Sequence, residues 1–342
     1  MNYVLCEADH NGRDAGAKAR ADIATILIDN SWTPLRLRMH WGEGNLGGKL
    51  VALKDNILDW RRLSRKLHSG DTMLMQFPIA MFPKVSMTAV PYLRRIHEKG
   101  ARCIALVHDL DSLRGFPAPL EEAFLPYADV IIVHNDYMAE HLSHFGFTDK
   151  LVTLEVFDYL TDCPMIDPVT RGIDIAGNLK PEKAGYVYEL GREFPDAAFN
   201  LYGPNYATGH ESDMWYRGTF PPSVLPGEMK GAFGLIWDGD STATCSGIYG
   251  EYLRYNNPHK LSLYLACGKP VLIWDQAAEA HFVESRQVGL AVSSIGEALA
   301  RVSTLSMGEY EHMQSNARKL GEALRNGHFT MRAVGKAREL LD

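Results

Sequence analysis

The order of apolar and polar positions predicts strands and helices that alternate along the first half of the chain. Short apolar runs, bounded by Gly, Asp, His or Asn, are typical of buried strands and lie at residues 3–6, 72–76, 102–107 and 130–133. Amphipathic segments of helix length separate them, at residues 17–30, 50–68, 87–99 and 136–145. This alternation predicts βαβ units and a parallel sheet that is covered on both faces.

The same alternation returns after a stretch that contains Pro and Asp, residues 158–170. Strands are predicted at residues 173–176, 198–202, 234–237, 271–274 and 290–292. Residues 308–342 have a helical pattern and no predicted strand. We therefore expect two Rossmann-like α/β domains facing one another across a cleft, at residues 1–160 and 161–320. A final helix, residues 321–342, is expected to pack back on the first domain.

Length, charge and cysteine usage narrow the class of protein. A chain of 342 residues is long enough for two cores. Its net charge of −7 gives no general attraction for nucleic acid, which we exclude as a main partner. The five cysteines lack the spacing of a zinc site and indicate reduced thiols in the cytoplasm. No leader or membrane-spanning stretch is predicted, although work at a membrane surface stays compatible with the sequence, as does a homo-oligomer.

The loop after the first predicted strand, residues 7–18, is rich in small residues and leads into a helix. Such a loop, with Gly16 near the helix start, lets backbone N–H groups approach an anion or a sugar. An ordinary turn is an equally good interpretation. The G-x-G-x-x-G fingerprint of dinucleotide-binding folds is absent, which argues against a nicotinamide enzyme.

Polar residues that could serve in acid–base chemistry follow the strand at residues 102–107. His108, Asp109 and Asp111 stand where open α/β sheets bind ligands, and one of them could act as a general base. Asp111 or Ser112 could instead cap a helix, and a cap is the favoured role of Asn135 or Asp136 after the next strand. The D-x-D pattern at residues 109–111 and 238–240 is short and common by chance, so no metal is predicted.

Two strand ends in the second half carry candidate ligand-binding residues. Asn178, Lys180 and Lys183 follow the strand at residues 173–176 and favour an anion site, with ordinary surface lysines as the alternative. Tyr202 and Gly203 end the next strand, where a ring and a turn could flank a nucleobase.

The longest polar segment of the chain, residues 238–262, gives the sharpest prediction. So long a loop rich in Gly, Ser, Asn and charge is typical of a functional site. Asn257 and Pro258 predict a helix entry that places Lys260 in the first turn. There the lysine charge and the unpaired backbone N–H groups together suit a diphosphate.

At these residues the chain resembles a known family. Residues 258–270, PHKLSLYLACGKP, resemble the segment by which many GT-B glycosyltransferases hold the donor diphosphate and ribose, except that Leu263 replaces a glutamate that binds ribose. Further matches at residues 108–114, 176–179, 235–241 and 244–260 resemble a bacterial family in particular. That family includes β-1,6-galactofuranosyltransferases and the glucosyltransferases that extend O-linked GlcNAc on serine-rich-repeat adhesins.

The resemblance implies an α/β protein of the GT-B fold, which inverts a UDP-sugar at the anomeric carbon and transfers the hexose to a carbohydrate acceptor without a metal or other cofactor. The expected acceptor is a lipid-linked, protein-linked or free glycan. The resemblance also implies a general base in the first domain, which binds the acceptor. This role falls to Asp109, with His108 or Asp111. Donor contacts in the second domain are implied for Asn178, Lys180, Lys183, Tyr202, Gly203, Asp238, Asp240, Ser241, Glu251, Tyr255, Asn256, Asn257, Pro258, His259, Lys260 and Ser262.

Two other functions stay open at this point. A UDP-sugar epimerase or hydrolase of the same fold would act on the donor without an acceptor. A non-catalytic subunit would bind the nucleotide sugar and lack a working base.

Overall fold

A computed structural model describes residues 1–8, 15–39, 46–79 and 82–342 of the chain. The chain divides into two compact units. The N-terminal unit contains residues 16–155 with the first strand and, from the far end of the chain, residues 329–342; the C-terminal unit contains residues 156–328. Most of the predicted small-residue loop, at residues 9–14, lies outside the described residues.

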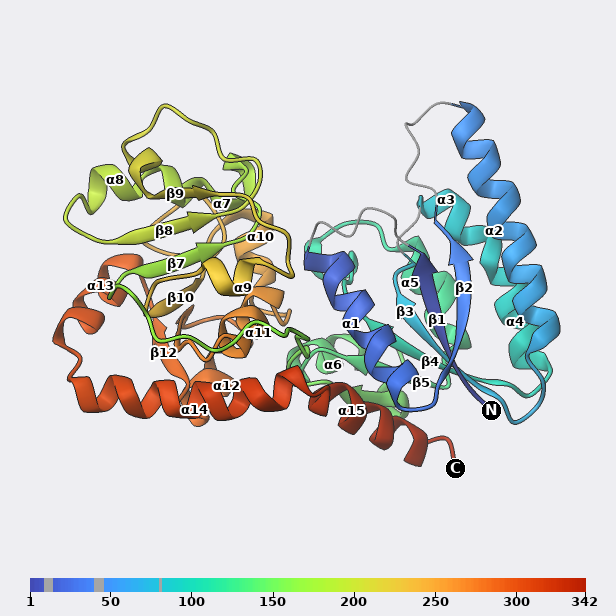
Figure 1. Cartoon of the computed structure of the whole chain (residues 1–342). Helices are drawn as coiled ribbons and strands as arrows, with labels where there is room; N and C mark the ends of the chain where they lie inside the picture. The colour runs from blue at the N-terminus through green and yellow to red at the C-terminus, as the bar shows by residue number, and fades with distance from the viewer. Residues whose placement is uncertain (9–14, 40–45, 80–81) are drawn as a thin grey trace. The chain divides into compact units, whose positions relative to one another are not determined.

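The N-terminal unit is built on a parallel sheet of six strands in the order β2-β1-β3-β4-β5-β6 (Figure 1). The strands are β1 (Asn2–Ala8), β2 (Thr33–Arg38), β3 (Thr72–Phe77), β4 (Arg102–Val107), β5 (Val130–Val133) and β6 (Leu151–Thr153). Between them lie α1 (Ala15–Asp29), α2 (Leu46–Lys66), α3 (Pro83–Ser86), η1 (Met87–Ala89), α4 (Val90–Glu98), η2 (Ser112–Arg114), α5 (Pro119–Phe124), η3 (Leu125–Tyr127), α6 (Asp136–Ser143) and η4 (Thr148–Lys150).

Alternate residues of these strands point to opposite faces of the sheet. On one face, Leu5, Met75 and Ala105 join a buried core with Trp60 of α2 and other residues of α4, α5 and α6. Helix α1 lies on the other face, where it buries Ile23 and other apolar residues (Figure 1). Both faces are therefore covered, as parallel sheets require.

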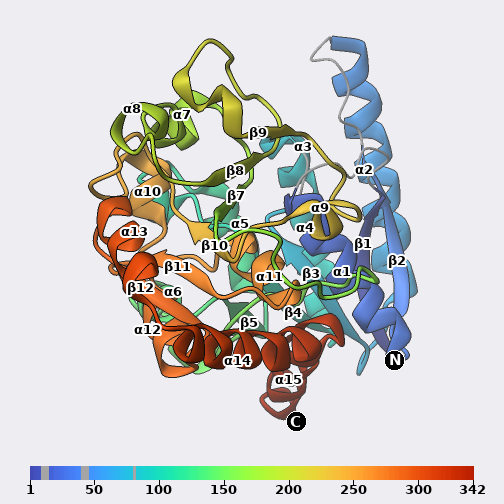
Figure 2. The ribbon, with the colours of Figure 1, turned by 60° about the vertical axis from the view of Figure 1, so that its left-hand side comes forward.

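The C-terminal unit repeats this plan with six parallel strands in the order β12-β11-β10-β7-β8-β9, seen from a second direction in Figure 2. The strands are β7 (Ile173–Ala176), β8 (Phe199–Tyr202), β9 (Tyr216–Gly218), β10 (Phe233–Ile236), β11 (Val271–Trp274) and β12 (Gly289–Val292). The helices are α7 (Pro181–Ala184), η5 (Gly185–Tyr188), α8 (Leu190–Glu193), η6 (Glu211–Trp215), α9 (Leu225–Glu228), α10 (Gly247–Tyr252), α11 (His259–Ala266), α12 (Ala280–Ser285), α13 (Ile295–Thr304), α14 (Met307–Arg325) and α15 (His328–Glu339). The last of these, α15, belongs to the N-terminal unit from Phe329 onward.

The two parallel sheets confirm the predicted pair of α/β domains. The structure adds three strands that the sequence did not predict, β2, β6 and β9. Each is an edge strand of its sheet.

Helix α11 is fixed on the second sheet by a close contact between Gly234 of β10 and Tyr264. A Cβ atom at Gly234 would lie 2.1 Å from Cγ of Tyr264, so only glycine leaves room for the ring. The Tyr264 hydroxyl accepts a hydrogen bond of 2.7 Å from the backbone N–H of Ala176 in β7. On its other side α11 meets α14, where a Cβ atom at Gly321 would lie 2.3 Å from the carbonyl oxygen of Leu265. These contacts determine where the first turn of α11 lies.

A buried ion pair joins the segment between α11 and β11 to β7 of the same sheet. Nζ of Lys269 lies 3.1 Å from Oδ2 of Asp174, and neither side chain is more than 4% exposed. Asp174 also accepts hydrogen bonds from the backbone N–H of Gly231 and from the Asn200 amide, at 2.9 Å each. The lysine of the Gly-Lys-Pro segment thus neutralises a buried carboxylate, which is a structural role.

Candidate functional site

Lys260, the lysine predicted to bind the diphosphate, lies in the first turn of α11, next to the end of β10. Its Nζ donates hydrogen bonds to the carbonyl oxygen of Trp237, at 2.7 Å, and to Oδ1 of Asp238, at 2.9 Å. Pro258 occupies the N-cap position, so the helix begins as the sequence predicts. Backbone N–H groups of a first helical turn have no partner within the helix. A fixed ammonium beside such groups forms a site suited to an anion.

The loop after β10, whose Asp238 binds Lys260, lies against the segment after β7 that contains Lys183. The N–H of Gly239 donates to the carbonyl oxygen of Lys183 at 2.8 Å, and that of Tyr186 donates to the Gly239 carbonyl at 3.2 Å. Gly239 has φ of +117°, and a Cβ atom there would lie 2.6 Å from backbone atoms of Ser246. Glycine is therefore required for this approach.

Asp240 and Ser241 stabilise the loop that contains them. The Ser246 hydroxyl donates to Oδ1 of Asp240, and the Asp240 N–H donates to the same hydroxyl oxygen at 3.2 Å. The carbonyl oxygen of Ser241 accepts from the Trp237 indole at 2.9 Å. Asp240 is exposed and Ser241 partly exposed, so both stay accessible to a ligand.

Asn178 and Lys180 lie in the turn after β7. Oδ1 of Asn178 accepts hydrogen bonds from the Lys180 N–H, at 3.1 Å, and from the Asn205 amide, at 2.9 Å. Lys180 itself is exposed and lies 3.5 Å from Glu182. The structure thus brings Lys183 to the loop that contains Asp238, whereas Lys180 extends into solvent from the N-cap of α7.

Of the two residues at the end of β8 that are predicted to flank a nucleobase, only Gly203 lies where the prediction requires. Tyr202 is 2% exposed and its hydroxyl donates to the carbonyl oxygen of Glu228, so its ring lies in the core and does not fit the predicted contact with a nucleobase. Gly203 does lie at the turn, where a Cβ atom would be 1.7 Å from the Gly177 carbonyl oxygen. The cause of the error is the direction of the last strand side chain, which a short apolar run does not specify.

Sequence reasoning missed a partly exposed aromatic stack beyond the same strand end. The rings of Tyr206 and Tyr216 are stacked with centroids 4.5 Å apart, and Tyr188 stacks on Tyr206 at 5.3 Å. The Tyr216 hydroxyl donates to the carbonyl oxygen of Gly203 at 3.1 Å. The signal available in the sequence was the spacing of aromatic residues in the loop after β8.

The other predicted donor residues lie at the end of α10, in the segment between α10 and α11, and in the first turn of α11. Ser262 is 1% exposed, and its hydroxyl has no hydrogen bond within the described part of the chain. The amide oxygen of Asn256 is also buried and has no hydrogen bond within the described residues. Glu251 is exposed and lies 2.7 Å from Nε of Arg254. The remaining members, Tyr255, Asn257 and His259, are buried or partly exposed in the segment that enters α11.

In the N-terminal unit, the predicted base candidates follow β4. Nε2 of His108 lies 2.8 Å from Oε1 of Gln76, whose amide nitrogen donates to the Arg20 carbonyl oxygen. Oε1 must therefore accept, which assigns the His108 proton to Nε2. Oδ1 of Asp109 lies 2.6 Å from the guanidinium of Arg114, and the Asp109 side chain is 43% exposed. Asp109 is thus an oriented carboxylate that solvent can reach.

A partly buried network holds the turn that contains these residues. The Ser112 N–H and hydroxyl both donate to the Glu121 carboxylate, at 3.0 and 2.6 Å, and the same hydroxyl lies 2.9 Å from Nε2 of His141. Burial lowers the pKa of His141. Asp111 is exposed and occupies the N-cap of η2 without a capping hydrogen bond from its side chain.

The next strand end carries a structural cap and a buried histidine. Oδ1 of Asn135 accepts a hydrogen bond of 3.1 Å from the Met138 N–H, which confirms the predicted cap of α6. Nε2 of His134 lies 3.1 Å from the carbonyl oxygen of Val107, and burial lowers the pKa of His134 to about 3. Gly16 is exposed in the first turn of α1, beside the residues outside the described ranges.

Two absences within the described residues bear on the site. No group of three or more His, Cys, Asp or Glu side chains there is arranged to hold a metal ion. No helix in the same ranges is long and apolar enough to cross a membrane.

Comparison with known proteins gives matches across both units. The family described as glucosyltransferase 3-like matches with its N-terminal domain over residues 1–156 and with its C-terminal domain over residues 173–337. The beta-1,6-galactofuranosyltransferase WbbI of Escherichia coli is 33% identical over 339 residues, covering 96% of this chain and 95% of that protein. Glucosyltransferase 3 of Streptococcus gordonii is 25% identical, covering 78% of each chain.

A solved structure with the same fold is an alpha-glucosyltransferase in complex with UDP-glucose and DNA containing an abasic site. It has a TM-score of 0.64 at 12% identity, covering 99% of this chain and 98% of that chain. This likeness confirms the predicted GT-B fold.

Proposed function

The chain belongs to the glucosyltransferase 3-like family and is a glycosyltransferase, and from this premise we propose that it transfers a hexose from a UDP-sugar to a hydroxyl group of a carbohydrate acceptor, with inversion at the anomeric carbon. The names of its relatives, which transfer glucose or galactofuranose, support a hexose. The acceptor is a lipid-linked, protein-linked or free glycan. The absence of a paired cysteine among all five supports a cytoplasmic setting.

The placement of Lys260 carries the proposal for the donor. Its ammonium is fixed by Asp238 and the Trp237 carbonyl at the N-terminal end of α11. A UDP-sugar presents two adjacent phosphates that such a site can neutralise as the bond to the sugar breaks. Lys183, joined through its backbone to Gly239, adds a second cation to the same region of the C-terminal unit. In this proposal no metal is needed for the leaving group.

The proposed chemistry assigns the base to Asp109 in the N-terminal unit. The acceptor oxygen attacks C1 of the donor sugar while the bond from C1 to the phosphate oxygen breaks. The acceptor hydroxyl proton passes to the Asp109 carboxylate, and UDP leaves with the bonding electron pair. Arg114 orients that carboxylate through Oδ1. His108, whose Nε2 donates to Gln76, is better placed to position the turn than to accept the proton through that atom.

A product assay tests this function. The purified chain is incubated with a panel of UDP-hexoses and a set of glycan acceptors, and transfer is read by mass spectrometry. We expect transfer from at least one UDP-hexose, and UDP release that depends on the acceptor. Release or epimerisation without an acceptor would indicate a hydrolase or epimerase, and binding without any turnover would indicate a non-catalytic subunit.

A further inference from the structure

Helix α2 presents an outward face that has no exposed acidic residue. Its exposed charged side chains are all basic, namely Lys49, Lys54, Arg61, Arg62, Arg65 and Lys66. The two acids of the helix lie inward: Asp59 is 2% exposed, and Asp55 is partly buried. Both pair with Arg38 of β2, at 2.9 Å. The inward acids therefore pair with Arg38, and Asp59 also lies 3.6 Å from the guanidinium of Arg62, whereas the other exposed cations of the helix form no ion pair within the described residues.

Three aliphatic side chains lie on the same outward face. Leu50, Val51 and Leu58 are 57%, 49% and 43% exposed. Val51, Lys54, Leu58, Arg61 and Arg65 follow one another at spacings of three and four residues, which places them along one side of a helix. Aliphatic and basic groups thus alternate along a single exposed stripe.

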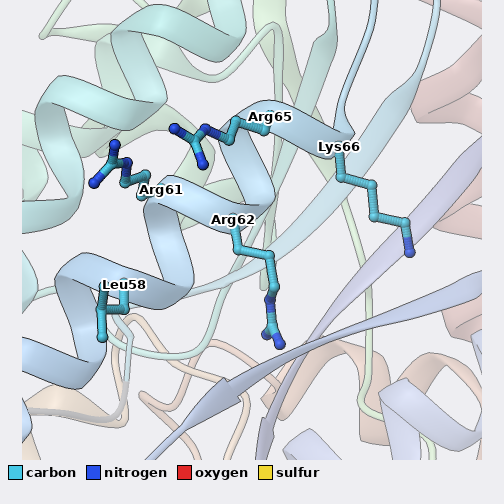
Figure 3. A pocket seen from close by; sticks show the side chains of 5 residues that line it. All are labelled: Leu58, Arg61, Arg62, Arg65 and Lys66. Carbon is cyan, nitrogen blue, oxygen red and sulfur yellow. The ribbon is translucent and has the colours of Figure 1, made fainter.

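Figure 3 shows the C-terminal part of this face, where Leu58 lies beside arginine and lysine side chains around an open hollow of about 520 Å³. Within the described ranges, Lys54, Arg61 and Arg65 form no ion pair, whereas Arg62 donates to the Arg36 carbonyl oxygen at 2.7 Å and lies 3.6 Å from Oδ1 of Asp59. This accumulation of positive charge stands out on a chain whose net charge is −7. It is complementary to an extended anionic surface.

We propose that the α2 face docks on a membrane surface that contains anionic lipids. Phosphate headgroups neutralise its cations, and the three aliphatic side chains enter the boundary between headgroups and acyl chains. A dissolved polyanion would neutralise the charge but leave Leu50, Val51 and Leu58 in water. The aliphatic groups therefore favour lipid over nucleic acid or an acidic polysaccharide. This inference depends on α2 alone and stands apart from the proposed reaction.

Vesicle flotation of the full chain tests the proposal. The wild type should bind vesicles of phosphatidylcholine mixed with phosphatidylglycerol and should not bind phosphatidylcholine alone. The variant Lys54→Gln/Arg61→Gln/Arg65→Gln should bind about a hundredfold more weakly, because each cation near an anionic surface contributes about a factor of five. A matched control, Lys319→Gln/Lys336→Gln/Arg338→Gln, removes the same charge from exposed positions of α14 and α15 and should bind like the wild type.

A second variant, Leu50→Ser/Val51→Ser/Leu58→Ser, separates lipid from other polyanions. It should bind the anionic vesicles about tenfold more weakly and bind heparin as the wild type does, since only the bilayer offers an apolar phase. All substituted side chains are exposed, so circular dichroism should show an unchanged fold. Equal vesicle binding by the charge variant and its control would overturn the proposal. So would heparin binding as tight as vesicle binding together with no effect of the serine variant.

Discussion

Nζ of Lys260 lies 2.9 Å from Oδ1 of Asp238, and the two side chains are 14% and 9% exposed. The carboxylate holds the long lysine side chain in one conformation before any ligand arrives, so less conformational freedom is lost on binding. The ammonium still has a third N–H to donate beyond those used by Asp238 and the Trp237 carbonyl. A diphosphate can therefore bind without breaking the pair.

Replacing this lysine gives the first prediction. Lys260→Ala should weaken UDP binding by about ten- to a hundredfold, because a charge-assisted contact contributes roughly 1.5 to 3 kcal/mol. Isothermal titration calorimetry measures the change. Lys319→Ala, on the exposed side of α14, serves as the control for loss of one positive charge. Unchanged UDP affinity in Lys260→Ala would remove Lys260 from the donor site.

The second prediction concerns the contact that positions α11. Gly234→Ala places a methyl group 2.1 Å from the Tyr264 ring, so the ring and its helix must move. The free energy of unfolding should fall by about 1 to 3 kcal/mol, as for other overpacked cores, and UDP affinity should fall with it. Gly335→Ala is the control, because among the described residues no atom beyond its chain neighbours and its own helix backbone lies within 4 Å of the added methyl group, and helix propensity predicts a gain of up to about 1 kcal/mol. Urea unfolding and calorimetry measure both effects, and equal stability of the two variants would contradict the packing argument.

The third prediction is a pH dependence that arises from His134. Its pKa in the folded chain is lowered by burial from 6.5 to about 3. Between these values the unfolded chain takes up a proton that the folded chain does not, so stability falls as the pH falls. One proton corresponds to about 1.4 kcal/mol per pH unit. In His134→Gln, which keeps an N–H donor for the Val107 carbonyl oxygen, the loss of stability with acid should be shallower by that amount. Urea unfolding at a series of pH values measures the slopes, and parallel slopes would contradict this account.

The sequence predicts the central strands and the entry into α11 well, for a physical reason. Strands such as β4 and β11 are buried on both faces and form continuous apolar runs. The three missed strands are edges, and β2 carries Pro34 and two arginines that a central strand would not accommodate.

The position of Lys260 follows from a local rule, whereas the surroundings of other predicted residues depend on tertiary packing. Pro258 sets a helix start whatever surrounds it, so the place of Lys260 could be predicted. The Tyr202 side chain points into the core, where its hydroxyl donates to the carbonyl oxygen of Glu228, twenty-six residues away in sequence. Lys269 belongs to the same motif as Lys260, yet its partner is Asp174, which only the folded sheet brings near.

The fourth prediction tests the proposed absence of a metal. If Lys260 and the backbone N–H groups of α11 stabilise the departing diphosphate, transfer should proceed in EDTA at close to its normal rate. The measurement is the initial rate of UDP release with and without chelator. Complete loss that Mn²⁺ or Mg²⁺ restores would instead assign metal binding to the carboxylates around Asp109 or Asp238.

The fifth prediction asks whether the acid–base role belongs to the N-terminal unit. Asp109→Asn keeps the shape of the side chain but cannot accept the acceptor proton. Turnover at saturating donor should therefore fall by about a hundredfold or more, while UDP affinity stays unchanged. Asp111→Asn, two residues further along the same turn, is the comparison of equal chemistry. It should lose less activity because Asp111 is not oriented by Arg114, which lies 2.6 Å from Asp109.

Stopped assays at saturating UDP-sugar and calorimetry with UDP separate the possible outcomes of this last experiment. A larger loss in Asp111→Asn would transfer the role of base to Asp111. If Asp109→Asn instead weakened UDP binding as much as Lys260→Ala while its turnover stayed intact, Asp109 would belong to the donor site. The division of donor binding and proton transfer between the two units would then be wrong, because a base acts on the acceptor hydroxyl and leaves the affinity for the nucleotide untouched.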